Sequence, residues 1–262
     1  MGDNSFLLTK WYLDCVADKG DTAILYVADL RWKAVSLRYG SALTVLDGKI
    51  SSTSSLHGIA VPTSEGNVIS VRQPALGVEG TWQRLRSAIR KKIFENAQGE
   101  VDWHCLQPMS EVDLRCQGVR IQGLGYAECL RLSIPPWHLP LRTLNWGRYL
   151  SPQDAVVWID WNGTEQVQFI VHNGEEYQAG KITESLLVFA DAGKSLNLDR
   201  GLILREGQLG DTVFSKISRL TKLLPRNVLA LDECKWRSRG TFRTSAGESC
   251  GWAIHEVIKW KK

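Results

Sequence analysis

The sequence predicts an all-β protein built from antiparallel sheets that form barrels or sandwiches, with few short helices. Short apolar runs, rich in β-branched and aromatic residues, recur along the chain and are closed by turn residues. Asx-Gly pairs follow several of these runs, and this pair suits a hairpin turn that needs two positive φ angles. The rhythm extends over both halves of the chain, which is typical of antiparallel all-β architectures.

The predicted strands divide between the two halves. In the N-terminal half they are Thr22–Ala28, Ala34–Tyr39 and Ala42–Leu46, followed by a turn at Asp47-Gly48. In the C-terminal half they are Val156–Trp161, Val167–His172, Lys181–Ala190, Gly201–Glu206 and Gly251–Trp260, with turns at Asn162-Gly163 and Asn173-Gly174.

Two segments fit a helical spacing. In Thr81–Gln98 the apolar residues recur every three to four positions, yet the segment fits two strands before a Gln98-Gly99 turn equally well. In Asp211–Leu224 the apolar residues lie on one helical face, and Pro225 then ends the run.

A short repeat predicts two lobes. Trp11-Tyr-Leu-Asp14 and Trp158-Ile-Asp160 each precede a turn and an apolar strand. One copy in each half suggests a duplicated β-unit, so we expect a lobe at residues 1–120 and another at 121–262.

Composition excludes several classes of partner. The net charge of +4 comes from scattered residues and does not predict a nucleic-acid partner. No run approaches the roughly 20 apolar residues of a membrane helix, and the start lacks a secretory signal pattern. The six cysteines show no metal-ligand spacing and predict reduced thiols in a cytoplasmic protein without a metal site. Eleven tryptophans are unusual and suggest a ligand cavity.

Common cofactor and nucleophile motifs are missing from the sequence. It contains no phosphate-binding GxxxxGK[ST], no GxGxxG before a helix, no GxSxG elbow between a strand and a helix and no HExxH. Gly247-Glu-Ser-Cys-Gly251 has the GxSxG letters but leads into the predicted strand Gly251–Trp260. We therefore expect no cofactor, no nucleotide-dependent chemistry and no serine hydrolysis.

The most informative stretch is Gly123-Leu-Gly-Tyr-Ala-Glu128. In a strand, Tyr126 and Glu128 project to the same side, and the two glycines permit a bulge or a close backbone approach. On the inner face of a barrel, burial disfavours the charged carboxylate, which would make Glu128 a proton donor with Tyr126 beside it. The structural alternative is that Glu128 pairs with Arg131 or Arg148.

Three motifs support a family comparison. Trp11-Tyr-Leu-Asp14, Trp103-His-Cys-Leu-Gln-Pro108 and Gly123-x-Gly-Tyr-x-Glu128 resemble the carotenoid 1,2-hydratase and AttH-like proteins, which are lipocalin-related two-barrel proteins. Tocopherol cyclase and fungal cyclisation enzymes are more distant kin. The resemblance implies two lipocalin-like lobes, a catalytic acid at Glu128 that protonates an alkene, and a cavity lined by Trp103 and His104. The hydratase motif ends in Asp and is followed by His and Asn, whereas this chain has Glu128, Cys129 and Leu130.

The expected substrate-binding residues extend beyond this motif. The π-faces of Trp103, Trp146 and Trp158 could stabilise a cationic intermediate, and Arg148 could hold a substrate carboxylate or a buried acid. Tyr12 and Asp14 come from the first motif. Asp14 and Asp160 are candidate second acids, although an Asp beside a turn usually accepts a local hydrogen bond.

These features lead to two main hypotheses of function. The first is a cofactor-free enzyme that uses acid catalysis for hydration, cyclisation or isomerisation of an apolar terpenoid, polyene or polyketide-like metabolite. The second is a non-catalytic carrier of a hydrophobic small molecule. A third, an interaction module, would have no continuous cavity.

Overall fold

The computed structural model describes residues 6–190, 192–199, 201–208, 210 and 230–260, and in them it confirms the all-β prediction. The strands form two antiparallel sheets of ten strands each, in two compact units, Met1–Pro135 and Pro136–Lys262. The boundary that we expected at residue 120 falls inside β10 (Val119–Leu132). Because β10 pairs with both β1 and β9, this strand belongs to the N-terminal unit, which ends at Pro135.

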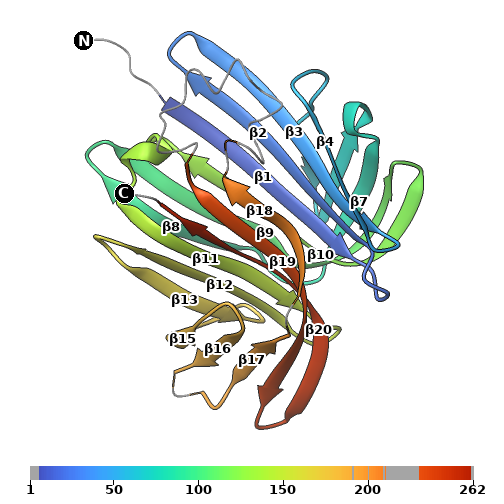
Figure 1. The fold of residues 1–262 in the computed structure, drawn as a ribbon, viewed down its shortest axis with the longest axis vertical. Helices are drawn as coiled ribbons and strands as arrows, with labels where there is room; N and C mark the ends of the chain where they lie inside the picture. Colours follow the sequence, from blue (N-terminus) through green and yellow to red (C-terminus); the bar gives the residue numbers. More distant parts are fainter. Residues whose placement is uncertain (1–5, 191, 200, 209, 211–229, 261–262) are drawn as a thin grey trace. The chain divides into compact units, whose positions relative to one another are not determined.

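The N-terminal unit holds the first ten strands, coloured blue to green in Figure 1. Its sheet has the order β4-β3-β2-β1-β10-β9-β7-β6-β5, with β8 also paired to β9. The strands are β1 (Phe6–Val16), β2 (Thr22–Trp32), β3 (Val35–Leu46), β4 (Lys49–Ser55), β5 (Thr63–Glu65), β6 (Val68–Gln73), β7 (Val78–Arg84), β8 (Ile89–Asn96), β9 (Gly99–Cys116) and β10. A short 3-10 helix, Pro74–Leu76, joins β6 to β7.

The C-terminal unit repeats this topology. Its order is β14-β13-β12-β11-β20-β19-β17-β16-β15, with β18 also paired to β19, so each strand corresponds to the N-terminal strand ten numbers earlier. A 3-10 helix, Pro136–His138, precedes the strands. They are β11 (Leu141–Leu150), β12 (Ala155–Gly163), β13 (Val167–His172), β14 (Glu175–Tyr177), β15 (Ala179–Ile182), β16 (Leu186–Phe189), β17 (Ser195–Leu198), β18 (Leu202–Gln208), β19 (Asp232–Thr244) and β20 (Gly247–Lys259).

The duplicated architecture does not come from the repeat seen in the sequence. Trp11–Asp14 lies in β1, whereas Trp158–Asp160 lies in β12, whose topological equivalent is β2. The strand equivalent to β1 is β11. Asp14 and Arg148 are then the equivalent residues, because each lies two positions before the end of its strand.

Two of the three predicted Asx-Gly turns are confirmed. Asp47-Gly48 joins β3 to β4 with φ angles of 48° and 76°, and Asn173-Gly174 joins β13 to β14 with 50° and 92°. The turn at Asn162-Gly163 is wrong, because both residues end strand β12. A Cβ on Gly163 would lie 1.7 Å from the carbonyl oxygen of Pro140, so this glycine permits a close backbone approach.

Thr81–Gln98 is two strands rather than a helix. β7 and β8 both pair with β9, and the turn at Gln98 then leads into β9. Sheet pairing decides between the two fits. Within β7, Trp82 is buried in the core while its neighbours are more exposed, which is the alternation expected of a strand. The second predicted helix, Asp211–Leu224, lies outside the described residues.

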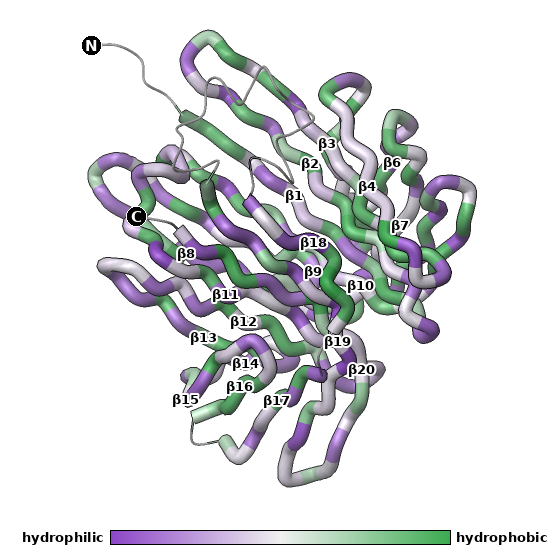
Figure 2. Tube along the Cα trace, in the orientation of Figure 1, coloured by the Kyte–Doolittle hydropathy of each residue, from purple (hydrophilic) through white to green (hydrophobic). Residues whose placement is uncertain are grey.

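One face of the N-terminal sheet packs a close apolar core. Leu13, Leu25, Trp82, Leu114 and Ala127 belong to a single buried cluster that draws on strands from both ends of the sheet. The cavity among these residues measures about 10 Å³, which leaves no room for a metabolite. The alternation of apolar and polar residues that produces such a face is visible along the strands in Figure 2.

The C-terminal unit has its own core on one face of its sheet. Tyr149, Trp158, Phe189 and Phe242 are members, and all are buried. Trp158 lies over Gly147, where an added Cβ would come within 2.1 Å of the indole ring. Trp158 is therefore a packing residue in this unit.

A buried histidine lies next to this core. His255 in β20 stacks on Trp236 with ring centroids 5.1 Å apart, and its Nε2 lies 2.9 Å from the hydroxyl of Ser238. Burial, followed by the nearby Lys235 ammonium, lowers the pKa of His255 from 6.5 to about 4. His255 is therefore neutral in the folded protein at neutral pH.

This depressed pKa predicts a pH dependence of stability. Between about pH 6.5 and pH 4 the unfolded chain binds a proton at His255 that the folded chain does not, so stability falls as the pH falls. The pKa difference corresponds to about 3 kcal/mol. We expect His255→Gln to lose less stability than the wild type over this window, measured by urea unfolding at several pH values. His57→Gln, at an exposed site, should keep the wild-type pH dependence; equal slopes for His255→Gln and the wild type would refute the assignment.

All six cysteines lie in the described part of the chain and are thiols, three of them buried. Among the described residues, no helix is long and apolar enough to span a membrane.

Candidate functional site

Strands β1 and β10 bring two of the sequence motifs together. They run antiparallel, with Tyr12 opposite Glu128 and Asp14 opposite Tyr126. Each motif carries a tyrosine two residues before its acid, so the pairing places each tyrosine across from the other motif's carboxyl group. The four side chains lie on one face of the sheet because residues two apart in a strand point the same way.

Glu128 accepts two hydrogen bonds on one oxygen. The Trp103 indole Nε1 donates to Oε2 at 2.6 Å, and the Tyr126 hydroxyl donates to the same oxygen at 2.7 Å. Trp103 and Tyr126 are fully buried, and Glu128 is half-buried. Both donors stabilise negative charge on Oε2.

The phenol beside Glu128 keeps its proton. Burial raises the pKa of Tyr126 well above 10, and the nearby Cys105 and Glu128 raise it further. Burial likewise raises the pKa of the Cys105 thiol well above 9. Both groups are therefore neutral at physiological pH, and Tyr126 acts as a hydrogen-bond donor.

A second tyrosine–carboxylate pair lies beside the first. The Tyr12 hydroxyl donates to Asp14 Oδ2 at 2.9 Å, and both residues are buried. The Tyr12 ring packs edge-on against Tyr26 at 5.2 Å and against Tyr126 at 6.0 Å. The sequence left open whether Asp14 is a second acid or a local hydrogen-bond acceptor. In the structure Asp14 accepts a local hydrogen bond from Tyr12.

The glycines of β10 have the role that the sequence predicted. The pairing of β10 with β9 shifts register between Gly125 and Glu128, which marks a β-bulge. A Cβ on Gly125 would lie 2.2 Å from the carbonyl oxygen of Asp14, and one on Gly123 would lie 2.2 Å from that of Val16. Bulge and close approach together position Tyr126 and Glu128 against β1.

Tyr12, Asp14, Trp103, Tyr126 and Glu128 form the Glu128 cluster. The sequence predicts this cluster on the inner face of a barrel, but it lies on the other face of the N-terminal sheet. Leu13 and Ala127 point into the apolar core of the N-terminal unit, so the alternate residues Tyr12, Tyr126 and Glu128 project from the other face of the same strands. Glu128 therefore lies outside the apolar core of the N-terminal unit, and that core is filled by side chains. The two-residue period of a strand predicted that Tyr126 and Glu128 share a face, but it did not indicate which face of the sheet packs the core.

His104 does not join this cluster. Trp103 and His104 are neighbours in β9 and point to opposite faces, and Trp103 is the one that reaches Glu128. His104 lies near Arg90 and Asp102; burial and the Arg90 charge lower its pKa. We had expected both residues to line one cavity.

Three predicted residues lie in the C-terminal unit. Trp146 and Arg148 share the face opposite the core, and the Arg148 Nη1 donates to the carbonyl oxygen of Trp252 at 2.7 Å. The Lys235 ammonium lies 5.4 Å from the centre of the Trp146 ring and pairs with Glu256. Trp158 projects from the other face into the core, so it shares no surface with Arg148.

The sequence reasoning missed two neighbours of the Glu128 cluster. Tyr26 in β2 lies opposite Tyr12, and Cys105 in β9 lies opposite Glu128. Tyr26 had a readable signal, because β1 and β2 form a hairpin whose short turn fixes this register. Cys105 had none, since the bulge shifts the register of β9.

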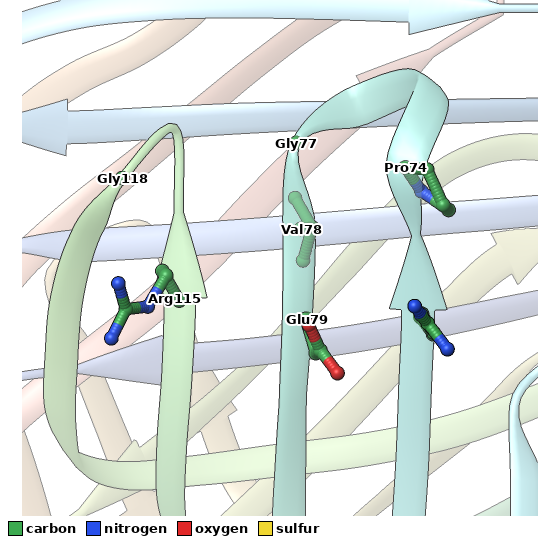
Figure 3. Close-up of a pocket in the computed structure, with 7 residues that line it drawn as sticks. Pro74, Gly77, Val78, Glu79, Arg115 and Gly118 are labelled. Carbon is green, nitrogen blue, oxygen red and sulfur yellow. The ribbon is translucent and has the colours of Figure 1, made fainter.

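A separate hollow of about 220 Å³ opens on the outside of the N-terminal unit (Figure 3). Glu79 stands in register between Arg72 and Arg115 on neighbouring strands, and all three are exposed. This row is an ordinary cross-strand pairing of opposite charges, and it supplies a matched control position below.

Comparison with known proteins identifies the fold. No protein-family model and no curated protein sequence matches the chain. The crystal structure of CghA matches with a TM-score of 0.64 at 12% identity, covering 98% of this chain and 89% of CghA. A protein assigned as AttH from Nitrosomonas europaea matches at 0.56 and 10%, covering 100% and 94%. Kievitone hydratase from Nectria haematococca matches at 0.53 and 9%, covering 98% and 90%.

The chain therefore has the fold of these proteins along nearly its whole length. This confirms the fold that the resemblance to AttH-like and hydratase proteins implied. Identities of 9% to 12% establish the fold and leave the activity to be argued from the site.

Proposed function

We propose that this protein is an enzyme that transfers a proton from Glu128 to an apolar metabolite. The observation that carries the proposal is the half-buried carboxyl group whose Oε2 accepts hydrogen bonds from Trp103 and Tyr126. An acid at the edge of a buried aromatic cluster is suited to protonating a weakly basic carbon–carbon double bond.

The reaction begins at the Glu128 carboxyl group. Its proton passes to the alkene, whose π electrons form the new C–H bond and leave a carbocation. The Glu128 carboxylate that remains is stabilised by Trp103 Nε1 and the Tyr126 hydroxyl, which are already in place.

The rings of Tyr12 and Trp103 would offer π-faces to the cation. The Tyr26 ring already lies under the Lys10 ammonium, which is 5.0 Å from the ring centre. Water then adds and returns a proton to Glu128, giving hydration. Alternatively, a hydroxyl group of the substrate adds to the cation and returns its proton to Glu128, giving cyclisation without a change of mass.

The structural relatives agree with this class of reaction. Kievitone hydratase is by its name a hydratase, and CghA has also been solved with a small molecule. The apolar substrate class rests on the aromatic surroundings of Glu128.

The test is product formation by the wild-type protein. We would incubate it with a panel of acyclic terpenes, carotenoid polyenes and polyketide polyenes and analyse the products by liquid chromatography with mass spectrometry. Hydration adds the mass of one water molecule, and cyclisation changes retention without changing mass. A protein that binds members of the panel and converts none would support the carrier alternative, which also predicts an intact apolar ligand in native mass spectra after purification.

A further inference from the structure

A chain of hydrogen bonds crosses one end of the C-terminal unit and passes through His172, the last residue of β13. The imidazole Nε2 lies 2.8 Å from Oδ1 of Asp154, which directly precedes β12. The imidazole Nδ1 lies 3.3 Å from Nζ of Lys194, which directly precedes β17. No part of the proton transfer proposed for Glu128 uses these residues.

The contact between His172 and Lys194, which we call the edge contact, joins the two ends of the C-terminal sheet. The strand order of this sheet begins with β14-β13 and finishes with β17-β16-β15 (Figure 1). Lys194 Nζ also donates to the Tyr177 hydroxyl of β14 at 2.7 Å, and the Tyr177 ring packs edge-on against Phe189 of β16 at 5.5 Å. Side chains thus connect β13 and β14 with β16 and β17, whose backbones pair with other strands.

The hydrogen-bond partners assign the proton on His172. A lysine ammonium has three donors and no acceptor, so Nδ1 accepts the hydrogen bond from Lys194 and carries no proton. Nε2 therefore carries the proton and donates to Asp154. Burial alone would raise the pKa of Asp154, but hydrogen bonds from Ser249 and His172 lower it below its usual value, so Asp154 is a carboxylate. His172 is then neutral, in a single tautomer.

The charges around His172 balance when it is protonated. Its side chain is 12% exposed and lies against the rings of Phe242 in β19 and Phe189 in β16. Glu175 lies opposite His172 in the register of β14 with β13, and it accepts a hydrogen bond from the Tyr177 hydroxyl at 2.7 Å. The titratable groups that face His172 are the carboxylates of Asp154 and Glu175, the ammonium of Lys194 and the hydroxyl of Tyr177. A second proton on His172 therefore gives two positive and two negative charges.

We propose that protonation of His172 breaks the edge contact and loosens the β16–β17 hairpin, which makes this end of the C-terminal unit a pH-sensitive switch. A protonated imidazole has a donor at both nitrogens, so Nδ1 can no longer accept a hydrogen bond from Lys194. The two cations, 3.3 Å apart, then repel each other. Asp154 keeps its hydrogen bond with Nε2, which becomes charge-assisted, so Lys194 is the partner that moves. The Lys194 carbonyl oxygen accepts a hydrogen bond from the Phe189 amide at 3.1 Å, and through it the change reaches the hairpin backbone.

The test is a titration of the full-length protein from about pH 8 to about pH 5, followed by two-dimensional NMR. At the upper end, the imidazole nitrogen resonances of His172 should show a proton on Nε2 and none on Nδ1. As His172 takes up a second proton, the amide resonance of Ser195 should shift with the same midpoint. Over the same range, the protection of the Phe189 amide against hydrogen exchange should fall about tenfold.

Two lysine variants make the result specific. Lys194→Met removes the ammonium and keeps an unbranched side chain, so the protection of the Phe189 amide should no longer depend on the protonation of His172. Lys181→Met, at an exposed position of β15, is the matched control and should behave like the wild type.

Three results would overturn the proposal. They are a His172 that takes up a proton without any change at Ser195 and Phe189, a His172 that stays neutral over the whole range, and a folded Lys194→Met that keeps the wild-type dependence. The wild-type titration alone decides the matter if Lys194→Met does not fold. The switch is independent of Glu128, so its failure would leave the proposed enzymatic function untouched.

Discussion

Replacing Glu128 by glutamine should reduce turnover by about 100-fold or more and leave substrate binding nearly unchanged. The amide of Glu128→Gln has the shape of the carboxyl group, and its oxygen can still accept hydrogen bonds from Trp103 and Tyr126. It has no acidic proton to transfer, so only the chemical step is lost. The measurement is the steady-state rate with a substrate identified from the panel, together with the dissociation constant of that substrate.

Two comparisons make this result specific. Glu79→Gln, at the exposed row in the outer hollow of the N-terminal unit, should keep wild-type turnover (Figure 3). Thermal unfolding should show that Glu128→Gln is folded. Turnover that persists in folded Glu128→Gln would remove the proton donor from the mechanism, whereas lost binding would indicate that the side chain holds the substrate rather than protonates it.

Gly147→Ala should destabilise the C-terminal unit by about 3 kcal/mol. The new methyl group would lie 2.1 Å from the indole of Trp158, which is itself buried in a close-packed core. Neither Trp158 nor the backbone of β11 can move without disturbing several strands. We would measure the shift of the thermal midpoint, which also tests whether Trp158 is a packing residue rather than a ligand-binding one.

The matched control is Gly180→Ala in β15, where an added Cβ meets its nearest neighbour at 3.4 Å. Its stability should change by no more than about 0.5 kcal/mol. In the double variant Gly147→Ala with Trp158→Leu, the smaller side chain makes room for the methyl group, so the combined loss should be smaller than the sum of the single losses. Strict additivity would contradict the clash.

Local patterns predicted the parts of the fold that depend on local physics. The Asp47-Gly48 and Asn173-Gly174 turns follow from the positive φ angles that these residues tolerate. The shared orientation of Tyr126 and Glu128 follows from the two-residue period of a strand. The bulge after Gly125 was likewise expected from glycine. Asn162-Gly163 is an Asx-Gly pair like the two confirmed turns, but contact of Gly163 with the Pro140 backbone holds this pair in a strand.

The sequence by itself determined the strand-rich architecture, the resemblance to the two-sheet hydratase-like proteins, and the acid and phenol on one side of β10. Only the tertiary structure decided which partners meet that acid. The pairing of β1 with β10 brings Tyr12 and Asp14 to Tyr126 and Glu128, and the register of β9 selects Trp103 and turns His104 away. The physical reason is that a strand's period defines two faces without assigning either to the core. That assignment depends on contacts between residues far apart in the chain, which no local pattern encodes.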